Sequence, residues 1–144
     1  MIRSLTATMA FLAVPAVAAA PAAQFNLKCS GTTTTQTIAG KETKPYTTIY
    51  RVDLAKKKWC EGECKALHDI YAVQPGEITL RYKNTDTFSE RSLTSDRIDR
   101  ETGAHKVTIT LANPRDRYST IILDYEGQCE RAVFSGFPSI TTKF

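Results

Sequence analysis

The stretch Y-S-T-I-I-L-D-Y, residues 118–125, would place apolar side chains on both faces of a strand, because Ile121, Ile122 and Leu123 follow one another. A strand with one face in water alternates apolar and polar residues, whereas a strand with neighbours or covering layers on both faces does not need to. We therefore predict that this stretch is the central strand of a sheet.

On either side of this stretch, the chain consists of short runs in which apolar and polar residues alternate, which is the period of a half-buried strand. The clearest runs are Phe25–Cys29, Tyr46–Leu54, Ile78–Tyr82 and Val107–Leu111. Turn residues separate the runs at the spacing of an antiparallel meander. The pattern predicts a mainly β fold, an antiparallel barrel or sandwich of roughly six to eight strands.

Two of the separating turns contain a glycine at a position that favours positive φ. In Q-P-G-E, residues 74–77, a type II turn would place Gly76 at positive φ. In R-E-T-G, residues 100–103, Gly103 would take the left-handed position that closes a tight hairpin.

One segment departs from the strand period, because Cys60, Cys64, Leu67 and Tyr71 recur at helical spacing. We expect one short helix near residues 60–71, covering an open end of the sheet.

The N-terminus has the order of a secretory signal peptide: Arg3, the apolar run Leu5–Val14, then small residues. We assign residues 1–23 to this peptide, with cleavage between residues 18 and 23. The apolar run is shorter than the about 20 residues that span a bilayer, so we expect no membrane span. Residues 24–144 then form a single β-rich domain, periplasmic or secreted.

The formal charge of +4 comes from basic residues scattered along the chain, and Lys56–Lys58 is the only run. Such a triplet is typical of a solvated turn, so we expect no nucleic-acid partner. A mildly basic surface suits an envelope protein or an anionic polymer as partner.

Four cysteines in an exported chain of this size indicate disulfides, because the compartment is oxidising. Cys29 lies in the first predicted strand and Cys129 near the last, and these strands are neighbours in a closed meander. We expect Cys29 to pair with Cys129 and Cys60 with Cys64. If Cys60 and Cys64 lie in a regular helix, their side chains are poorly aimed for bonding, and the cross-pairings stay open.

A metal site is the alternative for the stretch C-E-G-E-C-K-A-L-H, residues 60–68. Two thiolates and His68 are zinc ligand types, and Glu63 or Asp69 would supply a fourth ligand. Oxidised thiols do not ligate a metal, and the chain has no second well-spaced pair. We therefore predict no metal and no cofactor.

The sequence contains none of the common hydrolase, metalloprotease, phosphate-binding or dinucleotide-binding motifs. We expect His105 to face solvent beside its turn. The carboxylates nearby alternate with arginines and are expected to form local ion pairs: Asp96, Asp99 and Glu101 with Arg97 and Arg100. We predict that the protein is not an enzyme.

Four stretches resemble small exported bacterial β-rich proteins of uncharacterised function: residues 25–32, 50–54, 98–103 and 125–134. A further resemblance is to periplasmic lysozyme inhibitors, small barrels that also tie an early cysteine to a late one. The serine-glycine-x-x-tyrosine type signature of those inhibitors is not matched here. Ser30-Gly31 is followed by threonines, and Ser135-Gly136 by Phe137-Pro138.

The sequence favours a small exported non-catalytic binding domain of the bacterial envelope. The alternatives are a barrel carrier of a small apolar ligand and a periplasmic inhibitor of a hydrolase such as lysozyme. Large side chains would fill a small barrel, which favours the binding domain over the carrier: Phe25, Tyr50, Tyr82 and Phe134. We expect the contact surface on the loop stapled by Cys60 and Cys64, with Trp59 as contact residue. The other interpretation of Trp59 is a core residue that shields the disulfide.

Overall fold

The structure, a computed structural model, describes residues 22–138. Apart from its last two residues, the predicted signal peptide lies outside the described residues. No helix long and apolar enough to cross a membrane occurs in residues 22–138.

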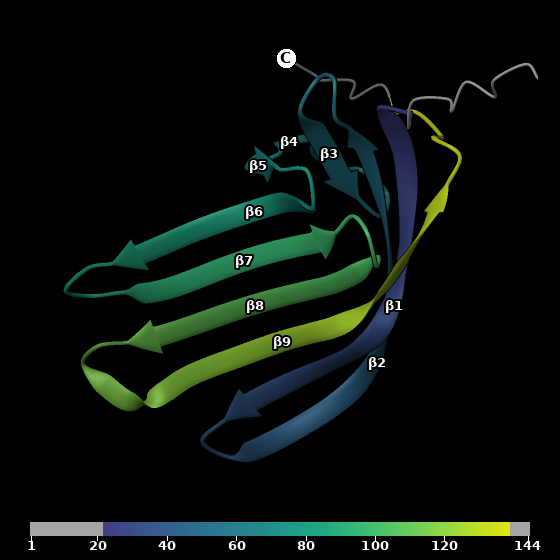
Figure 1. Ribbon diagram of the computed structural model, residues 1–144. Helices are drawn as coiled ribbons and strands as arrows, with labels where there is room; N and C mark the ends of the chain where they lie inside the picture. The colour runs from purple at the N-terminus through teal and green to yellow at the C-terminus, as the bar shows by residue number, and fades with distance from the viewer. Residues whose placement is uncertain (1–21, 139–144) are drawn as a thin grey trace, which may run out of the picture.

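The described chain forms one antiparallel sheet of nine strands in the order β4-β3-β2-β1-β9-β8-β7-β6-β5 (Figure 1). Their bounds are β1 Gln24–Thr37, β2 Gly40–Asp53, β3 Lys58–Glu61, β4 His68–Asp69, β5 Ala72–Val73, β6 Glu77–Asp86, β7 Arg91–Asp99, β8 Ala104–Asn113 and β9 Asp116–Ala132. The mainly β, antiparallel prediction is confirmed. The predicted strand number was too low, because β4 and β5 have two residues each and show no alternation.

The predicted central strand is β9, which is fifth of the nine strands in the sheet order. It is 17 residues long and pairs with β1 on one side and β8 on the other. The run of apolar residues at 121–123 therefore lies in the middle of the sheet, as its lack of alternation predicted.

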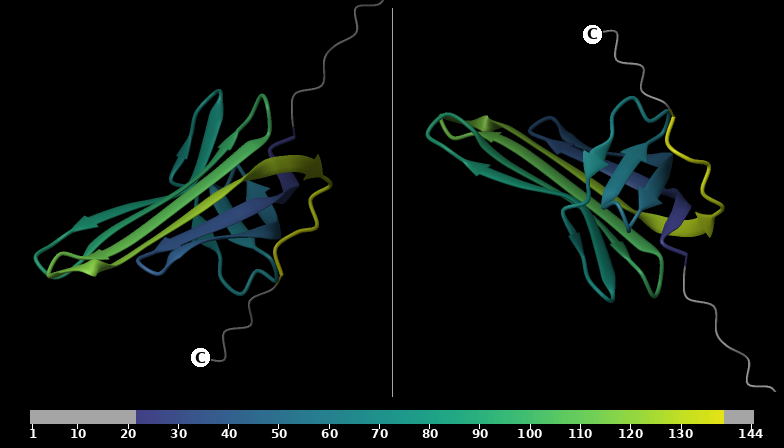
Figure 2. Two further views of the ribbon diagram at one scale, coloured as in Figure 1. Left: turned by 90° about the horizontal axis from the view of Figure 1, so that it is seen from below. Right: turned by 90° about the horizontal axis from the view of Figure 1, so that it is seen from above.

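Residues 68–73, which we call the strap, join the two edges of the sheet at one end. β4 pairs with β3, and β5, which follows it in the chain, pairs with β6. Ile70 lies between them, 6% exposed, and its N–H donates to Lys57 O. The sheet is thereby rolled into a half-barrel with a closed end, whereas the hairpin tips of β1–β2, β6–β7 and β8–β9 extend away as an open sheet (Figures 1 and 2).

The helix predicted near residues 60–71 is wrong, and residues 22–138 contain no helix. Gly62 and Cys64 have φ of 57° and 56°, a left-handed conformation that a right-handed helix cannot contain. The four residues at helical spacing do not form one buried face either. Cys60 and Cys64 are buried, whereas Leu67 and Tyr71 are 39% and 61% exposed.

The core fills the closed end. It consists of Phe25, Leu27, Cys29, Tyr50, Val52, Trp59, Ile70, Ile78, Leu80 and Ile98. These side chains come from five different strands and the strap, so one continuous sheet packs against itself. The architecture is a half-barrel, and the sandwich alternative does not apply to the described residues.

Two glycines let β1 and β9 approach each other next to the core. Gly31 and Gly127 are direct partners in the ladder. A Cβ on Gly127 would lie 2.2 Å from Ser30 O and 2.4 Å from the hydroxyl of Tyr46. Because real Cβ atoms do not come so close, only glycine allows this approach, which also makes room for the Tyr46 ring.

Both predicted disulfides are present. Cys29 and Cys129 are direct partners in β1 and β9, and their bond joins the first and last strands of the described chain. Cys60 and Cys64 close the loop that follows β3. Two disulfides are consistent with an oxidising extracytoplasmic compartment.

Candidate functional site

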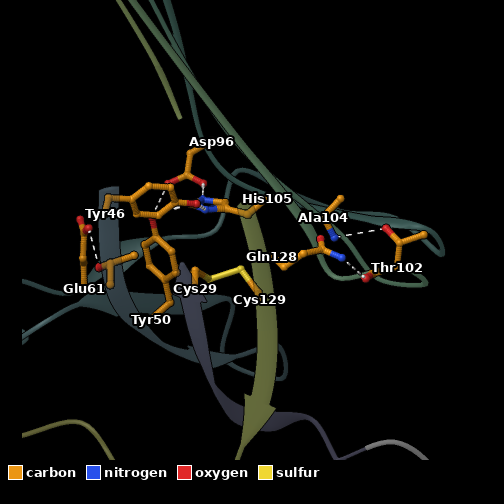
Figure 3. Close-up of a disulfide and its surroundings, with 11 residues drawn as sticks. Cys29, Tyr46, Tyr50, Glu61, Asp96, Thr102, Ala104, His105, Gln128 and Cys129 are labelled. Carbon is orange, nitrogen blue, oxygen red and sulfur yellow. Dashed lines mark hydrogen bonds and ion pairs between the residues drawn. A yellow bond between two sulfur atoms is a disulfide. The ribbon is translucent and has the colours of Figure 1, made fainter. Parts of the chain in front are cut away.

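A hydrogen-bonded cluster of four side chains lies where the closed end opens onto the extended sheet (Figure 3). His105 Nδ1 lies 2.8 Å from the Tyr46 hydroxyl, and His105 Nε2 lies 3.1 Å from Asp96 Oδ1. The Tyr50 hydroxyl donates to Asp96 Oδ2 at 3.4 Å. Asp96 and His105 are 5% and 2% exposed, so this polar network is shielded from water.

The strand register brings these residues together. On β7 and β8, His105 is the partner of Ile98 and Asp96 is the partner of Val107, so His105 and Asp96 are diagonal neighbours on one face. Tyr46 and Tyr50 reach the same face from β2, four residues apart. The cluster therefore depends on pairings between strands that are far apart in the sequence.

Burial raises the pKa of both tyrosines, and the negative charge of Asp96 raises it further. Their hydroxyls therefore stay protonated and act as hydrogen-bond donors at neutral pH. The two phenols and the carboxylate already satisfy one another through His105. The arrangement fits a structural network better than an acid–base pair poised to act on a substrate.

Sequence reasoning missed this cluster. His105 was expected to face solvent but is buried, and Asp96 was expected to pair with neighbouring arginines but bonds to His105 and Tyr50. Asp99 instead accepts hydrogen bonds from Thr102 and from the backbone N–H of Glu101, and these bonds, those from Thr102 foremost, lower the pKa of its carboxyl. The alternation of β7 did indicate that Asp96 is buried, because Asp96 lies two residues before the apolar Ile98 and so shares its buried face.

A pocket of about 220 Å³ lies beside the cluster, and we call it the mouth pocket. Its walls are Tyr46, Thr47, Thr48, Tyr50, Glu61, Arg81, Asp96, Val107, Ile109 and Tyr125. The Arg81 guanidinium lies 5.2 Å from the centre of the Trp59 ring, and Glu61 accepts a hydrogen bond from the Thr48 hydroxyl. The pocket thus combines aromatic and aliphatic walls with charges of both signs.

An apolar stripe continues from this pocket along the concave face, which at the closed end is the barrel interior. It consists of three cross-strand pairs between β8 and β9: Val107 with Tyr125, Ile109 with Leu123, and Leu111 with Ile121. Val107 is 7% exposed, whereas Leu111 and Ile121 are 44% and 39% exposed. We call these six residues the concave stripe. No element in residues 22–138 covers its outer part.

Trp59, the predicted contact residue, lies in the core and is 1% exposed. Its Nε1–H donates to Asp69 O at 3.1 Å, and its ring packs edge-on against Tyr50. The structure therefore places Trp59 in the hydrophobic core and not on an exposed surface. The stapled loop itself presents mainly charged side chains around a shallow depression lined by Glu61, Glu63, Lys65, Ala66 and His68.

The sulfur atoms of Cys29 and Cys129 and a ring nitrogen of His105 lie within 4.8 Å of one another. These are metal ligand types, but each sulfur is bonded to the other and offers no thiolate. The same holds for Cys60 and Cys64 beside His68. In the oxidised protein, neither group can act as a thiolate metal centre.

A second pocket, of about 470 Å³, lies at the end of the barrel where β1 begins. Its apolar walls include Phe25, Leu27, Ile78 and Ile98, which are all at most 7% exposed. These four side chains also belong to the hydrophobic core of the closed end.

Comparisons with known protein families, with curated proteins and with solved structures find no match to this chain.

The Tyr50→Phe variant tests the polar network. It removes the hydroxyl that bonds to Asp96 and should lower the free energy of unfolding by about 1–2 kcal/mol at neutral pH. The folded-state pKa of Tyr50 is raised above its ordinary value of 10.0, so its stabilisation is complete below that value and is lost as pH rises above it. We expect wild-type stability to fall more steeply above about pH 10 than that of the variant. Urea unfolding over this range measures both effects.

The control for this experiment is Tyr82→Phe, which alters an exposed tyrosine outside the network. It should follow the wild type. Equal alkaline slopes for wild type and Tyr50→Phe would contradict the buried network.

Proposed function

We propose that the protein is an exported, non-catalytic binding domain, periplasmic or secreted, that holds an envelope protein on the concave face of its half-barrel. The observation that carries this proposal is the concave stripe, an apolar surface that none of residues 22–138 covers at its outer end. Uncovered contiguous apolar surface is typical of protein interaction sites.

The size of the mouth pocket supports a protein partner over a small ligand. Pockets for small molecules usually have about 300–1,000 Å³, and this one has about 220 Å³, the volume of one large side chain. Tyr50, Trp59 and Leu80 fill the core behind it, and the pocket of about 470 Å³ where β1 begins shares no lining residue with it. A partner residue anchored in the pocket, with its neighbours on the stripe, fits this shape.

The chemistry of the site supports binding without catalysis. Three of the titratable groups at the pocket, Tyr46, Tyr50 and Asp96, are hydrogen-bonded within the network, and the raised pKa of both tyrosines keeps the two phenols neutral. None of them offers a free base at neutral pH.

The Leu111→Glu variant tests the proposal. The side chain is 44% exposed, so a charge there should leave folding almost unchanged while it removes apolar contact at the centre of the proposed interface. Affinity capture with crosslinking from the native envelope should recover a partner with the wild type. The amount of partner recovered with the variant should be at least about tenfold lower.

Thr110→Glu is the matched control, since it adds the same charge to the opposite face of the same strand. It should capture as well as the wild type. Equal capture by Leu111→Glu would contradict the proposal. If raised salt releases the partner and Leu111→Glu does not, the partner is an anionic polymer held by basic residues and not a protein on the stripe.

A further inference from the structure

One edge of the sheet is free along most of β6. The last strand in the order, β5, pairs only with Ile78 and Thr79, and Tyr71 N–H donates to Leu80 O just beyond them. No strand in residues 22–138 follows along residues 81–86 on that side (Figure 1). An exposed edge of this kind is a template for pairing with another strand.

The hydrogen-bonding groups on this edge are those of the even-numbered residues. Thr87 N–H donates to Glu90 O across the hairpin, so odd residues face β7, whereas Leu80 O faces the strap. Because backbone groups alternate along a strand, the N–H and C=O groups of Tyr82, Asn84 and Asp86 point away from the sheet.

Exposed aromatic residues lie at both ends of this edge. Tyr71 and Tyr82 are 61% and 44% exposed, and their ring centres lie 5.2 Å apart at one end. Phe88, in the β6–β7 turn at the other end, is 81% exposed, and the Arg115 guanidinium of the β8–β9 turn lies 4.5 Å from the centre of its ring. Antiparallel pairing with an identical edge would bring the tyrosine end of one copy against the Phe88 end of the other.

In one register, the β6 edges of two copies can pair without placing like charges opposite each other. A two-fold axis requires that residues with outward groups oppose one another. Centred on Asn84, it sets Tyr82 opposite Asp86 of the second copy and Lys83 opposite Thr85, with no like charges facing directly. Centred on Lys83, it would oppose two lysines, which is unfavourable. Asp86 is also partly neutralised within its own chain, because Arg91 Nε lies 3.1 Å from its carboxylate.

We propose that two copies of this chain pair through their β6 edges, antiparallel and centred on Asn84. Residues directly opposite in an antiparallel ladder lie on the same face. The two half-barrels would therefore join into one continuous sheet with both concave faces on the same side. This pairing goes beyond the proposed function and does not depend on it.

Analytical ultracentrifugation of the purified exported chain tests the pairing directly. Wild type should show a concentration-dependent monomer–dimer equilibrium. Asn84→Pro should weaken the dimer at least about tenfold, because proline removes an outward N–H but none that bonds to β7. Its melting temperature should stay near that of wild type, since edge positions tolerate proline.

Lys41→Pro is the matched control. On β2, Ile49 O faces the neighbouring β3, so odd residues of this strand face its outer edge, where Pro45 already lies. This variant should dimerise like the wild type. Phe88→Ser, at an exposed ring, gives a second test that leaves the backbone unchanged and should also weaken the dimer. A monomeric wild type at every concentration, or unaltered dimers in both Asn84→Pro and Phe88→Ser, would overturn the proposal.

Discussion

Trp59→Ala should lower the free energy of unfolding by about 3–5 kcal/mol, the usual cost of truncating a large buried aromatic residue. The ring is 1% exposed, packs against Tyr50 and lies under the Arg81 guanidinium. Its loss would leave a cavity at the centre of the closed end and free the carbonyl of Asp69 in the strap. Urea unfolding with both disulfides intact measures the change.

Tyr71→Ala is the control for this experiment, because it removes an aromatic residue that is 61% exposed. Its effect should stay within about 0.5 kcal/mol, as for most surface substitutions. A Trp59→Ala variant as stable as the control would contradict the core that the structure describes.

Removal of the Cys29–Cys129 bond should be the other large loss. The bond closes a loop of 100 residues, for which the chain-entropy account gives about 4–5 kcal/mol. The Cys60–Cys64 bond closes a separation of only 4 residues and should contribute about 2 kcal/mol. The double variants Cys29→Ala/Cys129→Ala and Cys60→Ala/Cys64→Ala therefore differ in expected stability although each removes one disulfide.

Non-reducing peptide mapping of the wild type should first confirm both pairings, and thermal unfolding should then rank the variants. The Cys60→Ala/Cys64→Ala protein should stay folded with a moderately lower melting temperature. If the Cys60→Ala/Cys64→Ala protein were instead the less stable of the two, the larger contribution expected of the Cys29–Cys129 bond would be contradicted.

Features that depend on local pattern were predictable from the sequence. The unbroken apolar run in β9 indicated the central strand, and Gly103 takes the positive φ that its hairpin turn requires. Gly76 is not among the residues with positive φ, so its turn differs from the type II turn expected. The disulfide pairing followed from the neighbouring positions of the first and last strands, which is a property of the meander.

Features that depend on long-range pairing were not predictable. Residues 60–71 looked helical because Cys60 and Cys64 are spaced four apart, but a disulfide joins these two buried residues across a loop in which Cys64 has positive φ. His105 had an ordinary polar context in the sequence, and only the register of β7 and β8 places it against Asp96. The concave stripe was visible as alternation in β8, but its exposure depends on how far the sheet remains open.

The most direct test of the proposed function is site-specific photocrosslinking from two adjacent isoleucines of β9. Ile121 lies on the concave stripe opposite Leu111, and Ile122 faces the other side of the sheet. A photoreactive residue at position 121 should yield a discrete crosslinked protein adduct in the native envelope, and one at position 122 should yield none. Adducts of equal yield from both positions, or from position 122 alone, would contradict the concave face as the binding surface.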